Sequence, residues 1–275
     1  MQPTNPHPQI QALRAAWEET VQSTIAIGQT LSEAQWLLPS PCPGWRLKDL
    51  ISHLTGIENL LLDPAETITL LVAEKPWVKN EFGQFAEVAV DLRRGNTGAE
   101  ILAEFEEVVA ERGSAWRSEV RAPEEETFFA PVGMLPLGTL LWRRVFDSWA
   151  HNQDLRMPLG LSGDLDGKAA EAVYRQVARL IPAIFAKKCA APIGSSAWLT
   201  ITGPGAFSYG AVINGDGKGE FLKTIPENVS ASIEMSTHDW YLLTCGRDGR
   251  ENAKVELAGD LNLAAKVLEN LTITP

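Results

Sequence analysis

The 275-residue chain is 45% hydrophobic and 21% charged, and its formal net charge is -11. This is the composition of a globular protein with room for one large or two modest domains, and we expect two. Nucleic acids and anionic membranes are bound through clustered Lys and Arg, so an acidic chain without a basic run is predicted to bind neither.

Localisation and redox environment follow from the N-terminus, the hydropathy and the cysteines. The start, MQPTNPHPQI, has neither the positive segment nor the apolar core of a signal peptide. No run of about 18 apolar residues is present to span a bilayer. We therefore expect a cytoplasmic protein. Cys42, Cys189 and Cys245 lack CxxC spacing, so structural or incidental roles are expected for them.

The first half of the chain is predicted to be helical. Apolar residues recur at helical spacing over residues 10–31, 47–61, 100–120 and 140–154. Residues 65–85 are expected to form a lid or loop region with a helical piece, and residues 121–137 a Pro- and Glu-rich connection. Four long helices with one long connection before the last are typical of a helical bundle.

The second half changes character. One more helix is predicted over residues 165–187, followed by strands at 198–202, 229–235 and 253–257, where hydrophobicity alternates with a period of two. Helical spacing returns at residues 237–243 and 261–271. The sequence therefore predicts a multidomain protein with an α domain at residues 1–161 and an α+β domain at residues 162–275.

The helix at 140–154 carries a polar stripe that a buried helix should lack. Arg144, Asp147, His151 and Asp154 follow one another at steps of three, four and three residues, which places them on one face. A buried carboxylate and imidazole need a partner, and a metal ion would satisfy both. Arg144 is interpreted as an ion-pair partner of Asp154, with binding of an anionic substrate as the alternative.

His53, on the second predicted helix, is the candidate third ligand beside Asp147 and His151. Three protein ligands leave a position open for water or substrate, as in catalytic divalent-metal sites. Trp45 and Trp149 flank these residues in the sequence and are candidates to line a substrate pocket. Their alternative role is core packing.

Two segments carry a family resemblance. PSPCPGWRLKDLISHLTGIE at residues 39–58 and LWRRVFDSWAHNQDLRMPLG at residues 141–160 resemble the N-terminal domain of the mycothiol-dependent maleylpyruvate isomerase family, a DinB-like four-helix bundle. The tail from SASIEM to LENL is similar to the sterol-carrier-like (SCP2-like) α+β domain of the same family. Together these resemblances cover nearly the whole chain.

The resemblance also implies a set of site residues. A divalent metal, usually zinc, would be held by His53, Asp147 and His151, and Arg247 in TCGRDGR would be a catalytic residue that reaches the substrate carboxylates. The alternative for Arg247 is a surface turn residue. The isomerase has glutamate at the acidic ligand position, so the shorter Asp147 would bring the metal closer to its helix or change its identity.

The resulting hypothesis is a metal-dependent enzyme that uses a low-molecular-weight thiol of the mycothiol type. It would isomerise or conjugate a small electrophilic substrate, as an isomerase or an S-transferase. Two alternatives are a non-catalytic small-ligand binding or sensing module with a structural or vestigial metal site, and a metal-dependent hydrolase. The expected partner is a small molecule, and no oligomeric state is predicted.

Overall fold

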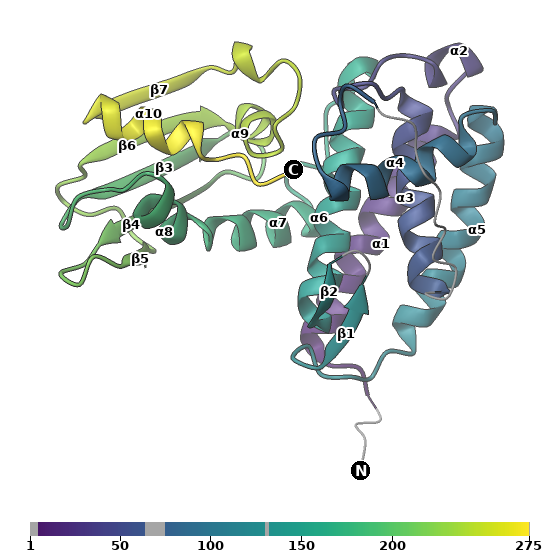
Figure 1. Cartoon of the computed structure of the whole chain (residues 1–275), viewed down its shortest axis with the longest axis horizontal. Coiled ribbons are helices and arrows are strands. Elements are labelled where there is room, and N and C mark those ends of the chain that lie inside the picture. The colour runs from purple at the N-terminus through teal and green to yellow at the C-terminus, as the bar shows by residue number, and fades with distance from the viewer. Residues whose placement is uncertain (1–4, 64–74, 130–131, 275) are drawn as a thin grey trace. The chain divides into compact units, whose positions relative to one another are not determined.

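A computed structural model describes residues 5–63, 75–129 and 132–274. Its contacts divide the chain into two compact units, Met1–Asp164 and Leu165–Thr274. The first unit contains helices and a small hairpin, and the second contains a sheet with helices (Figure 1). The chain is thus a mixed α and α+β protein, as predicted. None of the described helices is both long and apolar enough to cross a membrane.

The first unit is built from long helices that lie side by side (Figure 1). Contacts join α1 to α6, α6 to α3, α3 to α5 and α5 back to α1, so these helices surround a common core. The helices are α1 (Pro8–Gly28), α2 (Glu33–Trp36), α3 (Leu47–Leu62), α4 (Glu81–Arg93), α5 (Gly98–Arg117) and α6 (Leu137–Arg156), followed by the 3-10 turn η1 (Met157–Leu159).

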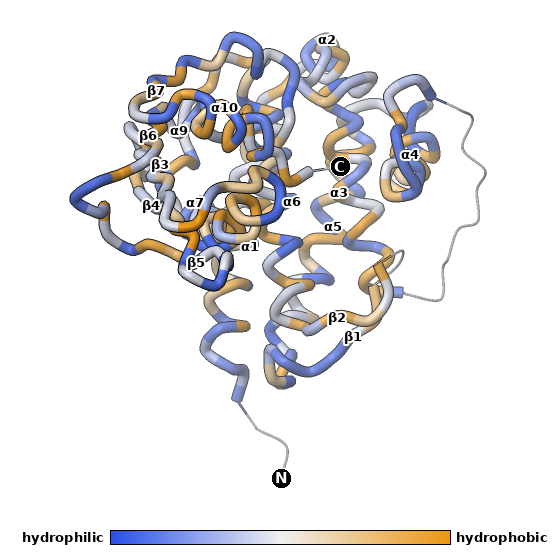
Figure 2. Tube along the Cα trace, turned by 60° about the vertical axis from the view of Figure 1, so that its left-hand side comes forward, coloured by the Kyte–Doolittle hydropathy of each residue, from blue (hydrophilic) through white to orange (hydrophobic). Residues whose placement is uncertain are grey.

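Local sequence explains where these helices start and which face they bury. Thr97 caps α5 and forms a capping box with Glu100, which satisfies backbone N–H groups that have no partner inside the helix. Hydrophobic and hydrophilic residues alternate along the helices (Figure 2). Trp17 and Trp116 are almost fully buried, with ring centroids 4.9 Å apart, and they join α1 to α5.

Two elements of this unit differ from the sequence prediction. Part of the predicted lid or loop region, residues 64–74, lies outside the described residues, and the end of that region is the start of the regular helix α4. A Cβ at Gly56 would lie 2.2 Å from the Cβ of Ala89, so α4 packs closely on α3. The predicted connection at 121–137 contains an antiparallel hairpin of β1 (Glu126–Phe129) and β2 (Gly133–Pro136). Strands of four residues are too short to give a clear period of two.

The second unit has a mixed sheet. Among its described residues, five strands follow the order β5-β4-β3-β6-β7, in which β3 and β6 are parallel and the other neighbours antiparallel. The strands are β3 (Ser196–Thr202), β4 (Phe207–Ile213), β5 (Gly219–Leu222), β6 (Ala231–Ser236) and β7 (Val255–Gly259). The prediction located β3, β6 and β7 and missed β4 and β5.

Helices pack on both halves of this sheet, one pair on the β4 side and another on the β6 side. Contacts join α7 and α8 to β4, and α9 and α10 to β6. The predicted single helix at 165–187 is interrupted near Pro182, which has no backbone N–H to donate. The elements are α7 (Lys168–Ala178), α8 (Ile181–Ala183), the π-turn η2 (Ile184–Lys188), α9 (Thr237–Thr244), the 3-10 turn η3 (Arg250–Asn252) and α10 (Leu261–Glu269).

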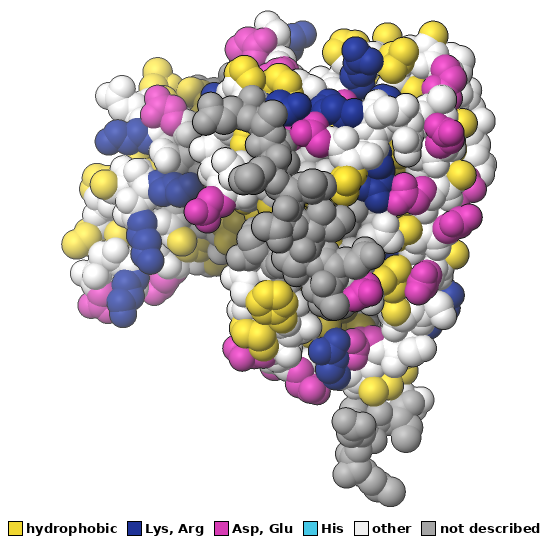
Figure 3. All heavy atoms as spheres, turned by 45° about the vertical axis from the view of Figure 1, so that its right-hand side comes forward, with side chains coloured by type: hydrophobic (Ala, Val, Ile, Leu, Met, Phe, Trp, Pro, Cys, Tyr) yellow, Lys and Arg dark blue, Asp and Glu magenta, His cyan; other side chains and the backbone are white. Residues whose placement is uncertain are grey.

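Charged side chains of both signs are interspersed on the face drawn in Figure 3. Lysines and arginines there alternate with acidic side chains and with hydrophobic ones. The expectation that the protein does not bind nucleic acid stays a prediction.

Candidate metal centre

Three side chains from two helices converge in the core of the first unit. His53 comes from α3, and Asp147 and His151 come from successive turns of α6. One ligand atom of each lies within 4.8 Å of the others. The His53 Nε2 atom is 3.3 Å from Asp147 Oδ2, and the His151 Nε2 atom is 3.5 Å from Asp147 Oδ1. The predicted ligand set is therefore brought together in space.

These distances are longer than most direct hydrogen bonds and close to those between the ligands of a shared cation. Neutral and charged N–H···O bonds are usually about 2.7–3.2 Å long. In a tetrahedral zinc site with bonds of about 2.0–2.1 Å, neighbouring ligand atoms stand about 3.3–3.4 Å apart. The histidine side chains are 5% and 7% exposed and Asp147 is 27% exposed. The cluster is thus buried on the histidine side and open at the carboxylate, which leaves room for another ligand.

A second carboxylate orients one of the histidines. Asp154 is fully buried, and its Oδ2 lies 2.8 Å from His151 Nδ1. If Nδ1 carries the proton in this bond, Nε2 presents its lone pair to the cluster, and such carboxylates commonly orient metal-binding histidines. The thiol of Cys42 donates to the same Asp154 oxygen over 3.3 Å. This contact fits the structural role, one of the two that were expected for Cys42.

Arg144 has other partners than the one predicted. Its Nε donates to Glu58 Oε1 and its Nη1 to Asp147 Oδ2, each over 2.8 Å. The predicted ion pair with Asp154 is wrong, because ten residues along an α-helix correspond to about 15 Å. Glu58 also accepts from Arg112 Nε over 3.2 Å. Glu58 therefore holds Arg144, and Arg144 in turn holds the Asp147 carboxylate.

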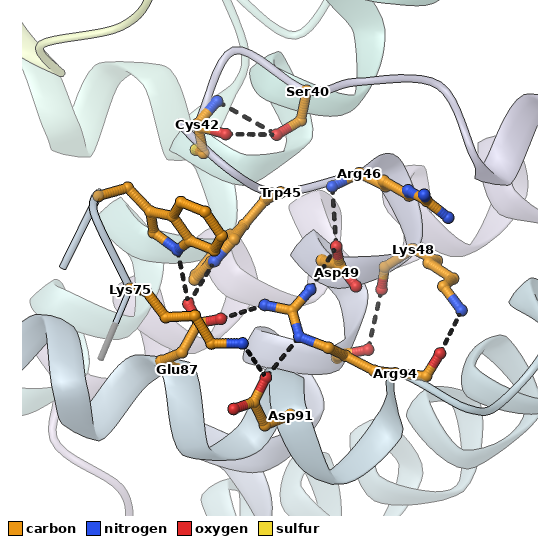
Figure 4. Close-up of polar contacts among 12 residues, drawn as sticks. Ser40, Cys42, Trp45, Arg46, Lys48, Asp49, Lys75, Glu87, Asp91 and Arg94 are labelled. Atoms are coloured by element: carbon orange, nitrogen blue, oxygen red, sulfur yellow. Dashed lines mark hydrogen bonds and ion pairs between the residues drawn. The ribbon is translucent and has the colours of Figure 1, made fainter. Parts of the chain in front are cut away.

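Trp45 stands beside the two histidines. Its ring centroid lies 5.2 Å from that of His53 and 5.9 Å from that of His151. Its indole N–H donates to Glu87 over 2.8 Å, and Glu87 is also paired with Arg94 (Figure 4). The rigid loop before α3 and an acidic residue of α4 thus hold Trp45 at the cluster.

Trp149, the other aromatic candidate, is fully buried. Its Nε1 donates to the carbonyl of Asp164 over 2.8 Å. This environment favours core packing over contact with a substrate.

Comparison with known proteins places this cluster in a family. A family model described as the mycothiol maleylpyruvate isomerase N-terminal domain matches residues 13–156, more than half of the chain. The chain belongs to this family. The matched region includes all three residues of the cluster, and the resemblance drawn from the two sequence segments is confirmed.

Solved structures extend the likeness to the rest of the chain. A crystal structure of the mycothiol-dependent maleylpyruvate isomerase is 18% identical and has a TM-score of 0.56, covering 92% of this chain and 93% of that one. A histidine-to-alanine mutant of that enzyme is also 18% identical, with a TM-score of 0.54 and coverages of 91% and 93%. At this identity the likeness shows the fold. No curated protein sequence is significantly similar to this chain.

The electrostatics of the cluster in this family member favour an ionised carboxylate beside a neutral imidazole. Burial would raise the pKa of Asp147, but attraction to His53 in its protonated form and to Arg144 outweighs burial and holds that pKa well below its usual range. Burial lowers the pKa of His53, and attraction to Asp147 does not fully offset it. Both directions favour the protonation states that bind a cation.

Arg247, the remaining predicted residue, lies in the second unit after α9. Its Nη1 donates to the carbonyl of Cys245 over 2.9 Å. The catalytic role implied for it by the family stays a prediction. Glu58 and Glu87 were missed at the sequence level, because a buried glutamate in a helix has the same spacing as an exposed one.

Proposed function

We propose that this protein is a divalent-metal-dependent enzyme that uses a low-molecular-weight thiol of the mycothiol type. It would isomerise or conjugate a small electrophilic substrate. Membership of the mycothiol maleylpyruvate isomerase family supports the thiol and the isomerase class. The metal is supported by one observation above others, the convergence of three ligand atoms within 4.8 Å of one another, with each histidine Nε2 3.3–3.5 Å from an Asp147 oxygen.

Different residues of the chain would bind the metal and position its ligands. His53, Asp147 and His151 hold the ion, and zinc suits this set of two imidazoles and a carboxylate. When bound, such an ion supplies Lewis acidity that makes a thiol more acidic, as it does a water molecule. Asp154 fixes the His151 ring, and Arg144 fixes the Asp147 carboxylate.

Substrate recognition would use groups around the open side. The Nη2 atom of Arg144 is buried and has no hydrogen-bond partner among the described residues. It therefore keeps a donor for an anionic substrate, although its other nitrogens are engaged. Trp45 would form an apolar wall beside the histidines. Arg247 is proposed, from the family resemblance, to bind substrate carboxylate, and Trp149 contributes only through packing.

Metal analysis tests the site directly. We expect about one equivalent of divalent metal per purified chain, in line with a single three-ligand site. His53→Ala and His151→Ala should each lose it. His238→Ala is the matched control, because His238 is exposed on α9 in the second unit, outside the cluster. A wild-type protein that stays metal-free after incubation with zinc would refute the metal-dependent proposal.

Activity should then require both metal and thiol. Conversion of maleylpyruvate is measured by absorbance with and without mycothiol, using the metal-loaded protein. Arg247→Ala should raise KM by about tenfold, as expected for a lost charged hydrogen bond to a carboxylate. Arg247→Lys should bring KM part of the way back to the wild-type value. Turnover that persists without thiol would instead favour a hydrolase, and an unaltered KM in Arg247→Ala would refute the role of Arg247.

A further inference from the structure

A groove in the second unit lies outside the metal cluster and has no part in the proposed function. It has a volume of about 740 Å³ and runs between α7 and the strands β4 and β5, which are labelled in Figure 1. This volume is in the range of small-molecule sites in proteins. All of its lining residues belong to the second unit.

The floor of the groove is aromatic. Tyr174 of α7 stacks on Phe207 of β4, with ring centroids 4.4 Å apart and an interplanar angle of 7°. Phe207 stacks in turn on Tyr209, at 5.5 Å and 6°. The hydroxyl of Tyr174 donates to the carbonyl of Leu165 and that of Tyr209 accepts from an indole N–H, so both phenol groups are already engaged. Tyr174 and Tyr209 are buried, so of these three rings only the half-buried Phe207 offers apolar surface to the groove.

An exposed aromatic ring marks the open side. Phe221 of β5 is 40% exposed although it lines the groove. It pairs with Ala211 in the sheet, and Ala211 lies on the same strand face as Phe207 and Tyr209. An exposed phenylalanine beside an aromatic floor gains free energy when a planar apolar group covers both.

The charges of the groove are separated along its length. Asp166 precedes α7, near Leu165, and Arg179 follows the last residue of α7. Since α7 has 11 residues, its ends lie about 16 Å apart. Glu171 and Arg175 pair with each other and offset each other's charge.

Arg179 and Lys223 are the remaining cations of the groove. Lys223 has no hydrogen bond or ion pair within the described parts of the chain, and Arg179 contacts only the neutral amide of Gln176, at 3.5 Å. Lys223 directly follows β5, two residues after Phe221, and so lies on the same strand side as that ring. Both cations line the groove, Arg179 at the C-terminal end of α7 and Lys223 at the end of β5 near Phe221.

We propose that this groove binds a small planar aromatic carboxylate. The aromatic body would lie against Phe221 and the part of Phe207 that stays open to the groove, and the carboxylate would pair with the cations Arg179 and Lys223. Charge complementarity selects an anion over a neutral or cationic analogue, and the stacked rings select a flat body over a branched one.

The test uses 2-naphthoate as the probe and isothermal titration calorimetry on the full chain. We expect saturable binding with one site, and about tenfold weaker binding in Arg179→Gln and in Lys223→Gln, the loss typical of one charged hydrogen bond. Lys218→Gln is the matched control, because Lys218 lies in the β4–β5 turn outside the groove. Its affinity should stay within about twofold of wild type.

Three comparisons distinguish binding in the groove from binding elsewhere on the protein. Naphthalene-2-methanol should bind more weakly than naphthoate and be insensitive to both cation variants, whereas 2-naphthylmethylammonium should bind least. His53→Ala should bind naphthoate as the wild type does, since the metal cluster is not involved. Equal binding of the cationic probe, loss of binding in His53→Ala, or no binding of naphthoate at millimolar concentration would each overturn the proposal.

Discussion

Asp154 offers the sharpest test of how the metal cluster is built. Its carboxylate is fully buried and lies 2.8 Å from His151 Nδ1. Loss of such a second carboxylate typically weakens metal binding by about 10–100-fold, which is about 1.4–2.7 kcal/mol. Asp154→Asn keeps an oxygen that can accept from Nδ1, so we expect about tenfold weaker zinc binding. Asp154→Ala removes the acceptor, and we expect about a hundredfold weaker zinc binding.

Competition with a chromophoric zinc chelator measures both affinities, and circular dichroism checks that the variants are folded. Asp164→Asn is the control, since Asp164 is an acidic residue of the same unit that pairs with Arg156 instead of a histidine. Its φ of 56° is a conformation that asparagine tolerates. Wild-type zinc affinity in a folded Asp154→Ala protein would refute the role given to Asp154.

Three further predictions concern the surroundings of the cluster. Glu58→Gln should lower the free energy of unfolding by about 3–5 kcal/mol in urea titrations, because it leaves the buried guanidinium of Arg144 without its main counter-charge. Gly44→Ala should lower Tm by about 2–8 °C, because Gly44 has φ +78° and a Cβ there would lie 2.3 Å from the ring of Trp77. Zinc retention should persist as the pH falls below about 6.5 and be lost only at lower pH, since burial lowers the pKa of His53 and its neutral form binds metal.

Each of these three predictions would be contradicted by a specific result. An unfolding free energy within about 1 kcal/mol of wild type in Glu58→Gln would show that the guanidinium is compensated by water. An unchanged Tm in Gly44→Ala would mean that the loop rearranges without cost. Zinc release is measured by dialysis at each pH and metal analysis. A midpoint of release above about pH 6.5 would contradict the lowered pKa of His53.

The three candidate ligands could be found from the sequence because helix geometry fixes their relations. Asp147 and His151 are four residues apart on one helix, so they share a face wherever that helix is placed. His53 was proposed because it lies on another predicted helix of the bundle, and the family resemblance implies the same ligand set, but no local rule states which turn of α3 faces α6. The partner of Arg144 was predicted incorrectly for a related reason. Its carboxylate, Glu58, is 86 residues away in the chain and is brought near only when α3 packs on α6.

The fold shows the same division. The long helices and β3, β6 and β7 have clear periodicity, whereas β4 and β5 include glycines, and β5 has only four residues with an exposed phenylalanine, Phe221, among them.

What the sequence determined by itself is therefore whatever depends on neighbours along the chain: the helices, their caps, the polar stripe of α6 and the membership of a family. Only the tertiary structure decided which groups meet across elements, namely the ligand separations, the bond from Cys42 to Asp154, the Glu58 network and the aromatic groove. The physical reason is that spacing along a helix or strand fixes direction only within that element. Contacts between elements depend on how side chains of both interlock in the core.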